Sequence, residues 1–174
     1  KDAMTLARLL STLHHSPKPT IAMVQGCAYG GGAGLIAACD LAIAASTARF
    51  CFSEIKLGLI PAVISPFVVQ AIGERQAKGL FLTAEVFDAT RALNLNLINH
   101  MVSDDTLLEY TLNYAKTISQ YSSEAATKCK KLTQYVANKT IDDQLSVYTA
   151  TLIAQQRVSA EGQKGLKAFL NKGS

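Results

Sequence analysis

The sequence predicts an α/β domain followed by an all-helical region. Short apolar segments between residues 20 and 102 alternate with helical patterns and with glycine or serine turns, which is typical of α/β folds. Beyond residue 103 only helical periodicity remains. The chain has 174 residues, of which 49% are hydrophobic and 17% charged, enough for one core and a small appendage. We therefore divide it into a core, residues 1–102, and a helical region, residues 103–174.

The first elements of the core are a helix and three short strands around a second helix. Leucines at helical spacing predict a helix over residues 2–15, which ends before Pro17. Strands are expected at 20–24, 41–45 and 48–52 because these runs are short, apolar and bounded by turn residues. Between the first two strands, small apolar residues over 31–39 predict a buried helix.

The rest of the chain is mostly helical in pattern. The core continues with helices over 63–72 and 75–82, a turn and short helix over 83–95, and a last strand over 98–102. Four further helices follow, starting near Thr106 and expected at 106–121, 124–137, 141–158 and 161–171. Their apolar faces are larger than a small core can cover, which indicates association between copies of the chain.

A dense group of glycines lies between the first strand and the buried helix. Five of the 11 glycines fall within nine positions, at Gly26, Gly30, Gly31, Gly32 and Gly34. Glycine permits positive φ and close approach of a ligand to backbone amides, and a helix that begins there presents unpaired N–H groups and a positive dipole end. One interpretation is an anion or oxyanion site. The other is a close-packed turn without chemistry, and the residues alone leave both open.

The glycine spacing excludes three familiar sites. It does not match the dinucleotide fingerprint, no Gly-Lys-Ser/Thr follows as in a phosphate-binding loop, and there is no Gly-x-Ser-x-Gly elbow. An oxyanion site therefore needs an acid or base from elsewhere in the chain.

Two carboxylates are candidates for that acid or base. Asp40 directly precedes a strand, which favours a cap or turn role. Glu54 follows the third strand among apolar neighbours, where partial desolvation suits a carboxylate to proton transfer near neutral pH. A surface carboxylate paired with Lys56 is the alternative, and the sequence does not choose between them.

Composition limits the other classes of function. The net charge is +4, with basic residues spread along the late helices, which favours a solvated face over a nucleic-acid site. The cysteines (Cys27, Cys39, Cys51, Cys129) and the histidines (His14, His15, His100) have no metal-ligand spacing, so no metal is expected. Three cysteines lie in apolar or glycine-rich runs, which predicts reduced core residues in a cytoplasmic or mitochondrial-matrix protein. Neither a signal peptide nor a membrane-spanning segment is predicted.

Several motifs together resemble one known family. They are Lys18-Pro19-Thr-Ile-Ala, Gln25-Gly26, Gly30-Gly31-Gly32, Cys39-Asp40, Phe52-Ser-Glu54 and Leu57-Gly58-Leu-Ile-Pro61. The likeness continues through Leu82-Thr83-Ala84-Glu85 and Ala92-Leu93-Asn94-Leu95 to Gly165-Leu-Lys-Ala-Phe169. This pattern resembles the crotonase (enoyl-CoA hydratase/isomerase) superfamily. Around Glu54 it is most similar to methylglutaconyl-CoA and γ-carboxygeranoyl-CoA hydratases.

The resemblance implies a fold and a set of roles. The fold would be the ClpP-like ββα spiral core followed by a helical oligomerisation region. The N–H of Gly31 would be one of two oxyanion donors to the thioester oxygen of an acyl-CoA, and Glu54 would be the acid/base. Substrate or CoA binding would involve Cys27, Ala28, Tyr29, Gly30, Ile60, Pro61, Phe169 and Lys172, with Ala62, Val63 and Ile64 adding to an apolar pocket wall.

The resemblance also implies partners. The substrate would be an acyl-CoA thioester, with a branched or carboxylated acyl group of the kind found in leucine or terpene breakdown. No further cofactor would be needed, because coenzyme A is part of the substrate. The assembly would be a homotrimer or a dimer of trimers, with neither nucleic acid nor membrane as a partner.

The sequence departs from the family pattern at two places. Hydratases of the superfamily commonly carry a second glutamate where this chain has Gly34, and water addition normally uses both carboxylates. Enoyl-CoA hydratase is therefore the first expectation, Δ3,Δ2-enoyl-CoA isomerase the second, and a catalytically weak CoA-thioester-binding module the third. The family's other oxyanion donor and its adenine-binding loop would precede Lys1, so we expect part of the fold to be missing from this chain.

Overall fold

The computed structural model describes residues 2–172, with the side chain of residue 172 left out. The chain forms two compact units, the first ending at Ile118 and the second beginning at Ser119. The boundary expected at residue 102 coincides with the end of the last strand, whereas the compact units divide later because α6 packs on the first unit.

Two small sheets form the frame of the first unit. The first sheet is parallel and contains, in spatial order, β1 (Ile21–Val24), β3 (Leu41–Ala45) and β6 (His100–Val102). In the second sheet, β4 (Arg49–Cys51) lies between its parallel neighbour β2 (Cys27–Tyr29) and its antiparallel neighbour β5 (Phe87–Asp88). The chain crosses from the first sheet to the second at Gly26, whose φ of 73° suits glycine.

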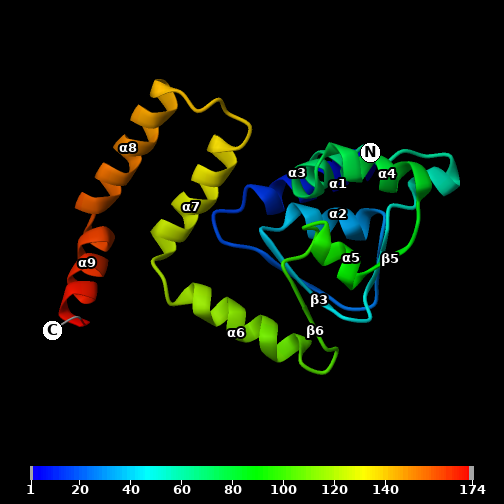
Figure 1. Cartoon of the computed structure of the whole chain (residues 1–174), viewed down its shortest axis with the longest axis horizontal. Helices are drawn as coiled ribbons and strands as arrows, with labels where there is room; N and C mark the ends of the chain where they lie inside the picture. The colour runs from blue at the N-terminus through cyan, green and yellow to red at the C-terminus, as the bar shows by residue number, and fades with distance from the viewer. Residues whose placement is uncertain (1, 173–174) are drawn as a thin grey trace. The chain divides into compact units, whose positions relative to one another are not determined.

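Helices pack around α2 (Gly31–Ala38), which contacts α1 (Asp2–His14) and α3 (Ser65–Ile72). Figure 1 shows α1, α3 and α4 together on one side of the first unit, with α2 between them and β3. Alanine and glycine dominate α2, and small side chains let neighbouring backbones approach closely. The other elements of this unit are the 3-10 turn η1 (Glu54–Leu57), α4 (Glu74–Thr83), α5 (Ala89–Asn94) and α6 (Leu107–Ser119).

Aromatic side chains fill the centre of the first unit. The rings of Phe50 and Phe87 stack at 5.6 Å, and Phe52 meets Phe81 edge to face at 5.2 Å. A smaller buried cluster joins α6 to the first sheet, where Leu107 packs with Ile43 and Ala45. The strand–helix junctions are therefore fixed by a closely packed core.

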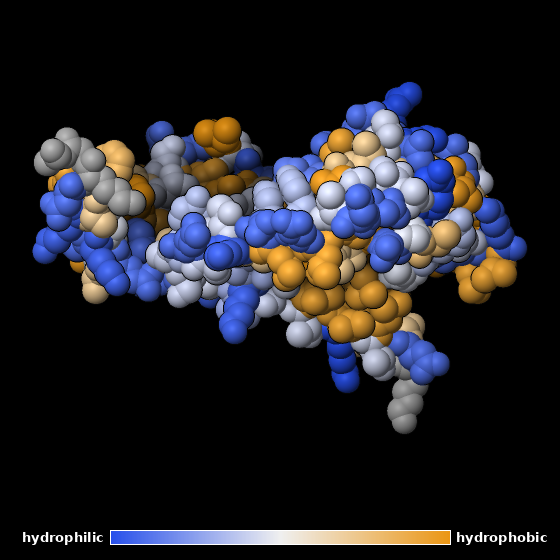
Figure 2. Space-filling view, turned by 90° about the horizontal axis from the view of Figure 1, so that it is seen from below, coloured by the Kyte–Doolittle hydropathy of each residue, from blue (hydrophilic) through white to orange (hydrophobic). Residues whose placement is uncertain are grey.

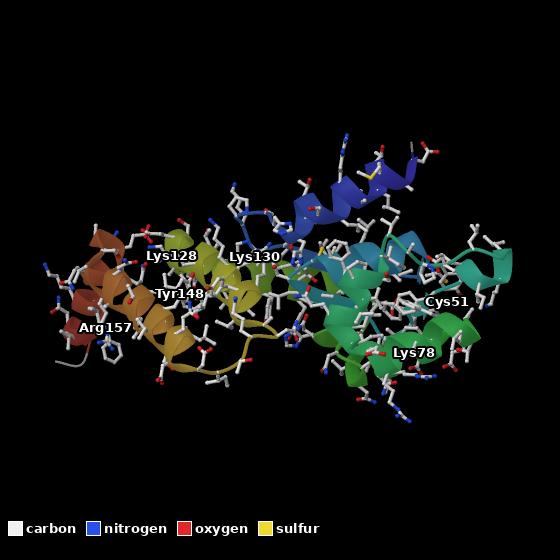
Figure 3. The ribbon with its side chains drawn as sticks, turned by 90° about the horizontal axis from the view of Figure 1, so that it is seen from above. Cys51, Lys78, Lys128, Lys130, Tyr148 and Arg157 are labelled. Carbon is white, nitrogen blue, oxygen red and sulfur yellow. The ribbon has the colours of Figure 1, made fainter. Side chains whose placement is uncertain are left out.

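The second unit consists of α7 (Ser123–Val136), α8 (Asp143–Val158) and α9 (Ala160–Lys172). Its described residues, 119–171, include no buried side chain. Local contacts hold it: the hydroxyl of Ser122 bonds the Glu161 carboxylate, and the rings of Tyr135 and Tyr148 lie 4.3 Å apart. Figure 3 shows the labelled Lys128 on α7, and its ammonium donates to Gln156 on α8 at 2.6 Å. Across residues 2–172, no helix has the length and hydropathy needed to cross a bilayer.

Most of the predicted elements are present, but two interpretations need correction. Residues 27–29 form strand β2, not part of a glycine turn, because they pair with β4. Cys51 is buried as expected, whereas Cys27 is exposed and Cys39 only half-buried, since the alternation of side chains along β2 directs Cys27 away from the core.

Candidate functional site

The glycine group forms the junction between β2 and α2. Gly30 has φ 51° and ψ −119°, a conformation open to glycine. Its N–H donates to the carbonyl of Cys51 at 2.9 Å, and its carbonyl accepts from the N–H of Gly34 at 3.1 Å. Cys51, labelled in Figure 3, belongs to β4, so the turn is attached to the second sheet on one side and to α2 on the other.

The N–H of Gly31 opens α2 and lies beyond this fixed turn. The first N–H groups of a helix have no intrahelical acceptor, and α2 has no side-chain cap. Within residues 2–172 the N–H of Gly31 makes no hydrogen bond. The group is therefore available to an oxygen that gains negative charge, with the positive end of the helix dipole behind it.

The carboxylate of Glu54 lies directly against this turn. A Cβ added to Gly30 would lie 3.3 Å from Glu54 Oε1, so glycine leaves room for the carboxylate. Glu54 begins the turn η1, whose geometry is closed by the Leu59 N–H donating to the Glu54 carbonyl at 3.1 Å. Its second oxygen, Oε2, is buried and has no hydrogen-bond partner among the described residues.

The alternative of an ion pair with Lys56 is not observed. The Lys56 ammonium instead lies 3.9 Å from the sulfur of Cys51. A buried carboxylate oxygen without a partner is costly unless something else bonds to it. The structure thus places an unpaired carboxylate beside a turn with an unpaired N–H donor, and groups of these two kinds can move a proton and stabilise an oxyanion.

Gly34, where a second glutamate was considered, is closed to any side chain. A Cβ at Gly34 would lie 2.2 Å from Cγ2 of Ile64 and 2.7 Å from its Cβ. Ile64 is only 2% exposed and its carbonyl accepts from Val68 N at the start of α3. One side of the site is therefore hydrocarbon, and within the described part of the chain Glu54 is the carboxylate at the turn.

An apolar pocket of about 390 Å³ adjoins the turn η1. Two residues expected to bind substrate, Ile60 and Pro61, contribute to its wall, as does Ile55, the neighbour of Glu54. Apart from Ser65, Glu74 and Lys78 its lining is hydrocarbon; the remaining members are Leu59, Ala62, Val69, Phe81 and Leu82. Figure 2 shows hydrophobic side chains at the surface of the first unit.

The residues expected along β2 divide between two faces. Cys27 and Tyr29 are exposed, whereas Ala28 is buried in the core and presents a ligand with its backbone only. Partial desolvation raises the pKa of Tyr29, and the neighbouring Cys27 raises it further. Tyr29 therefore stays a neutral hydroxyl beside Gly30 at ordinary pH.

The two site residues expected on α9 belong to the second unit. Phe169 is exposed there, so within that unit its ring has no core contact. Lys172 ends α9, but its side chain lies outside the described residues. In the described part of the chain, no group of His, Cys, Asp and Glu side chains could hold a metal ion.

The contact between Gly34 and Ile64 is the feature of the site that sequence reasoning missed. Ile64 was expected only as part of an apolar wall. A glycine in a buried helix is a general signal of close approach, but no local pattern identifies which distant side chain approaches.

Comparison with known proteins gives one family throughout. A family model described as "Enoyl-CoA hydratase/isomerase" matches residues 3–174. A Thermus thermophilus protein with the provisional name enoyl-CoA hydratase is 31% identical over 172 residues, which are 99% of this chain and 68% of that protein.

Solved structures give the same result. One from Legionella pneumophila, provisionally described as an enoyl-CoA hydratase/isomerase (crotonase), is 68% identical with a TM-score of 0.95 and covers 98% of this chain. An enoyl-CoA hydratase from Shewanella pealeana is 47% identical with a TM-score of 0.92, again over 98% of this chain. The chain spans 66% and 64% of the lengths of these two relatives.

Proposed function

The chain belongs to the enoyl-CoA hydratase/isomerase family with a crotonase fold, and on that premise we propose that the protein acts on the double bond of an enoyl-CoA thioester. Glu54 transfers the proton, and the N–H of Gly31 donates to the thioester oxygen as it gains charge. The observation that carries this proposal is the buried, unpaired Oε2 of Glu54 next to the Gly30–Gly31 turn.

Each group has a role that follows from its surroundings. Negative charge on the thioester oxygen is stabilised by a backbone donor that needs no reorganisation, an effect of about 2.7–4 kcal/mol for one donor of this kind. Glu54 has no competing hydrogen bond at Oε2, so this oxygen can exchange a proton with substrate or water. The turn is held by bonds to Cys51 and Gly34, which keeps the donor and the carboxylate at a fixed separation.

Water addition to a 2-enoyl-CoA is the reaction we propose first. The oxygen of water bonds to C3, a proton reaches C2, and the double bond is consumed. Support comes from the relatives in Thermus thermophilus and Shewanella pealeana, whose names describe enoyl-CoA hydratases. With Glu54 as the carboxylate, the same group takes the proton from water and delivers it to carbon.

A double-bond shift from a 3-enoyl- to a 2-enoyl-CoA is the second candidate. It requires removal of a proton from C2 and its return at C4, which one carboxylate accomplishes without water. The specific observation that favours it is the contact of Gly34 with Ile64, which excludes a second carboxylate at residue 34.

The acyl group is proposed from the lining of the pocket. Ile60, Pro61 and Ala62 present hydrocarbon next to η1, which favours a branched apolar acyl group over a carboxylated one, because the cation of the lining, Lys78, is already paired with Glu74. The nucleotide end of CoA is proposed to meet the Phe169–Lys172 end of α9, and the assembly is proposed to be a trimer or a dimer of trimers.

The test compares the protein with its Glu54→Gln variant on three thioesters: crotonyl-CoA, 3-methylglutaconyl-CoA and a 3-enoyl-CoA. Loss of the 2-enoyl absorbance reports hydration, and its appearance from the 3-enoyl substrate reports isomerisation. Turnover should fall about 10²–10⁴-fold in Glu54→Gln, with thioester binding retained. Glu109→Gln, an exposed carboxylate on α6, is the matched control and should leave rates unchanged.

Two results would contradict the proposal. Equal turnover by the protein and Glu54→Gln would exclude Glu54 as the acid/base. Binding of thioesters without turnover of any of them would instead indicate a CoA-thioester-binding module.

A further inference from the structure

Gly34 of α2 and Ile64, which precedes α3, are both buried and lie in close contact. Gly34 lies one helical turn after Gly30, to whose carbonyl its N–H donates. Gly30 is the residue whose absent side chain leaves room for Glu54. One turn of α2 therefore separates residue 34 from Gly30, the residue that contacts the Glu54 carboxylate.

Ile64 cannot move aside to admit a side chain at residue 34. The predicted overlap includes its Cβ, at 2.7 Å, which no rotamer displaces. Its side chain is buried, and its carbonyl is bonded by the N–H groups of Phe67 and Val68 at 3.1 Å each. The overlap therefore comes from the Ile64 side chain from its Cβ outward, and the hydrogen-bonded backbone at the start of α3 fixes where that Cβ lies.

Ile64 also lies close in sequence to two residues of the apolar pocket. The neighbouring Ala62 and Ser65 line that pocket, while Ile64 faces Gly34 in the core. Its hydrocarbon thus occupies the volume where a side chain at residue 34 would begin.

From these contacts we propose that Ile64 is a specificity-determining residue. By filling the volume beside Gly34 it restricts the site to the single carboxylate Glu54, and so sets the partition between water addition and the double-bond shift. The inference rests on the proposed function: one carboxylate shuttles a proton between two carbons, whereas two can divide the tasks of deprotonating water and protonating C2.

The test opens space beside residue 34 and introduces a carboxylate there in the same protein. Because the overlap includes the Ile64 Cβ, the substitution at this position is Ile64→Gly, which leaves Cα at an ordinary 3.8 Å. Ile64 is the N-cap residue of α3, a position where glycine is accepted. The variants are Gly34→Glu, Ile64→Gly, the double variant of both, and Gly34→Gln/Ile64→Gly as the uncharged control of nearly equal shape.

Thermal unfolding tests the steric part without reference to activity. Gly34→Glu alone should lower the melting temperature strongly or prevent folding. Ile64→Gly should lower it by on the order of 10 °C through the cavity it leaves. The melting temperature of Gly34→Glu/Ile64→Gly should be only slightly below that of Ile64→Gly. A melting temperature of Gly34→Glu equal to that of the unaltered protein would overturn the proposal.

Kinetics test the functional part. The ratio of hydration to isomerisation should rise by roughly tenfold or more in Gly34→Glu/Ile64→Gly, and its pH–rate profile should gain a second carboxylate ionisation. The glutamine control should show neither change. If the glutamate and glutamine double variants have the same ratio and profile, residue 34 does not face the reacting atoms, and the proposal is wrong.

Two further outcomes separate a failure of this proposal from a failure of the proposed function. If Gly34→Glu/Ile64→Gly does not fold while Gly34→Ala/Ile64→Gly does, the volume does not hold a carboxylate, and the proposal is also wrong. If the unaltered protein turns over neither substrate, the proposed function fails, whereas the melting temperatures still show whether Ile64 excludes a side chain.

Discussion

The two compact units differ in how they treat their apolar residues. In the first unit Phe50 and Phe52 are fully buried, and all the helices from α1 to α5 contribute to the larger of its two buried clusters. In the second unit the described residues include no buried side chain. Even large apolar residues, such as Ile141, Val158 and Phe169, are strongly exposed there. A short helix gains most of its stability from packing an apolar face, so the second unit lacks what stabilises the first.

The difference separates two tasks. The roles proposed for the Gly30–Gly31 turn and Glu54 need fixed geometry, and these residues lie at a strand–helix junction held by the core of the first unit. Exposed apolar faces on the second unit are of the kind that a second chain covers. This contrast predicts four outcomes, which range from a large effect on stability to a small one.

Replacing one phenylalanine in each unit should give opposite results. Phe50 is 0% exposed and Phe169 is 76% exposed. Phe50→Ala should lower the free energy of unfolding by about 3–5 kcal/mol, because it leaves a cavity beside Phe87. Phe169→Ala should change it by no more than about 0.5 kcal/mol. Urea unfolding at a concentration where light scattering reports single chains measures both; equal losses would mean that the second unit has a core of its own.

Removing one N–H at the rigid junction should lower activity without loss of stability. Gly31 is the first residue of α2, where proline is well tolerated, so Gly31→Pro removes the donor by replacing its hydrogen with the ring Cδ. We expect kcat/KM to fall by a factor equivalent to about 2.7–4 kcal/mol, with an unchanged melting temperature. Gly31→Ala keeps the N–H and has room, since its Cβ would meet only Leu6 at 3.8 Å; a similar loss in Gly31→Ala would argue against the donor.

Placing a charge on the exposed face of α8 should separate copies of the chain. Ile153 is half-exposed, and Ile153→Lys would bury an unpaired charge if a second chain covers this face, weakening association by roughly tenfold or more. Light scattering should then report a lower mass, and the melting temperature should no longer depend on concentration. Gln155→Lys, on the same helix, is the control; an unchanged mass in Ile153→Lys would show that this face is not an interface.

The smallest effect is expected at an exposed ion pair of the first unit. The Lys78 ammonium lies 2.9 Å from Glu74 Oε1, and their hydrogen bond lowers the pKa of Glu74 below the ordinary 4.5. A lowered folded-state pKa contributes stability above the unfolded value and loses it as the pH falls through the folded value. Lys78→Met should raise the pKa of Glu74 toward 4.5, measured by NMR titration.

Stability at neutral pH should scarcely change in Lys78→Met, because both side chains are exposed. The exposed pair Glu124–Lys128 in the second unit is the matched case, and Glu124→Gln, which keeps the bond from Lys128 to Gln156, should be equally mild. A large loss in either variant would show that burial is not what distinguishes the two units.

Local sequence patterns were sufficient to place most elements. The strand Leu41–Ala45 and the start of α2 at Gly31 were predicted at the observed residues, because apolar runs and glycine turns are local signals. The role expected for Asp40 is consistent with its contacts: its Oδ2 accepts from the N–H and the hydroxyl of Thr20 at 2.7 and 3.0 Å. Strand β2 was missed because its three residues form a strand only by pairing with β4.

The sequence by itself determined which groups are available for chemistry: a turn rich in glycine, a helix that begins there, and a glutamate after the next strand. Only the tertiary structure decided how they meet. It brings Glu54 Oε1 against Gly30, leaves Oε2 buried and unpaired, and closes Gly34 with Ile64. These are contacts between residues far apart in the chain, and they depend on where the backbones of α2 and α3 pack. Local periodicity carries no information about such distances, since close packing of the whole core sets them.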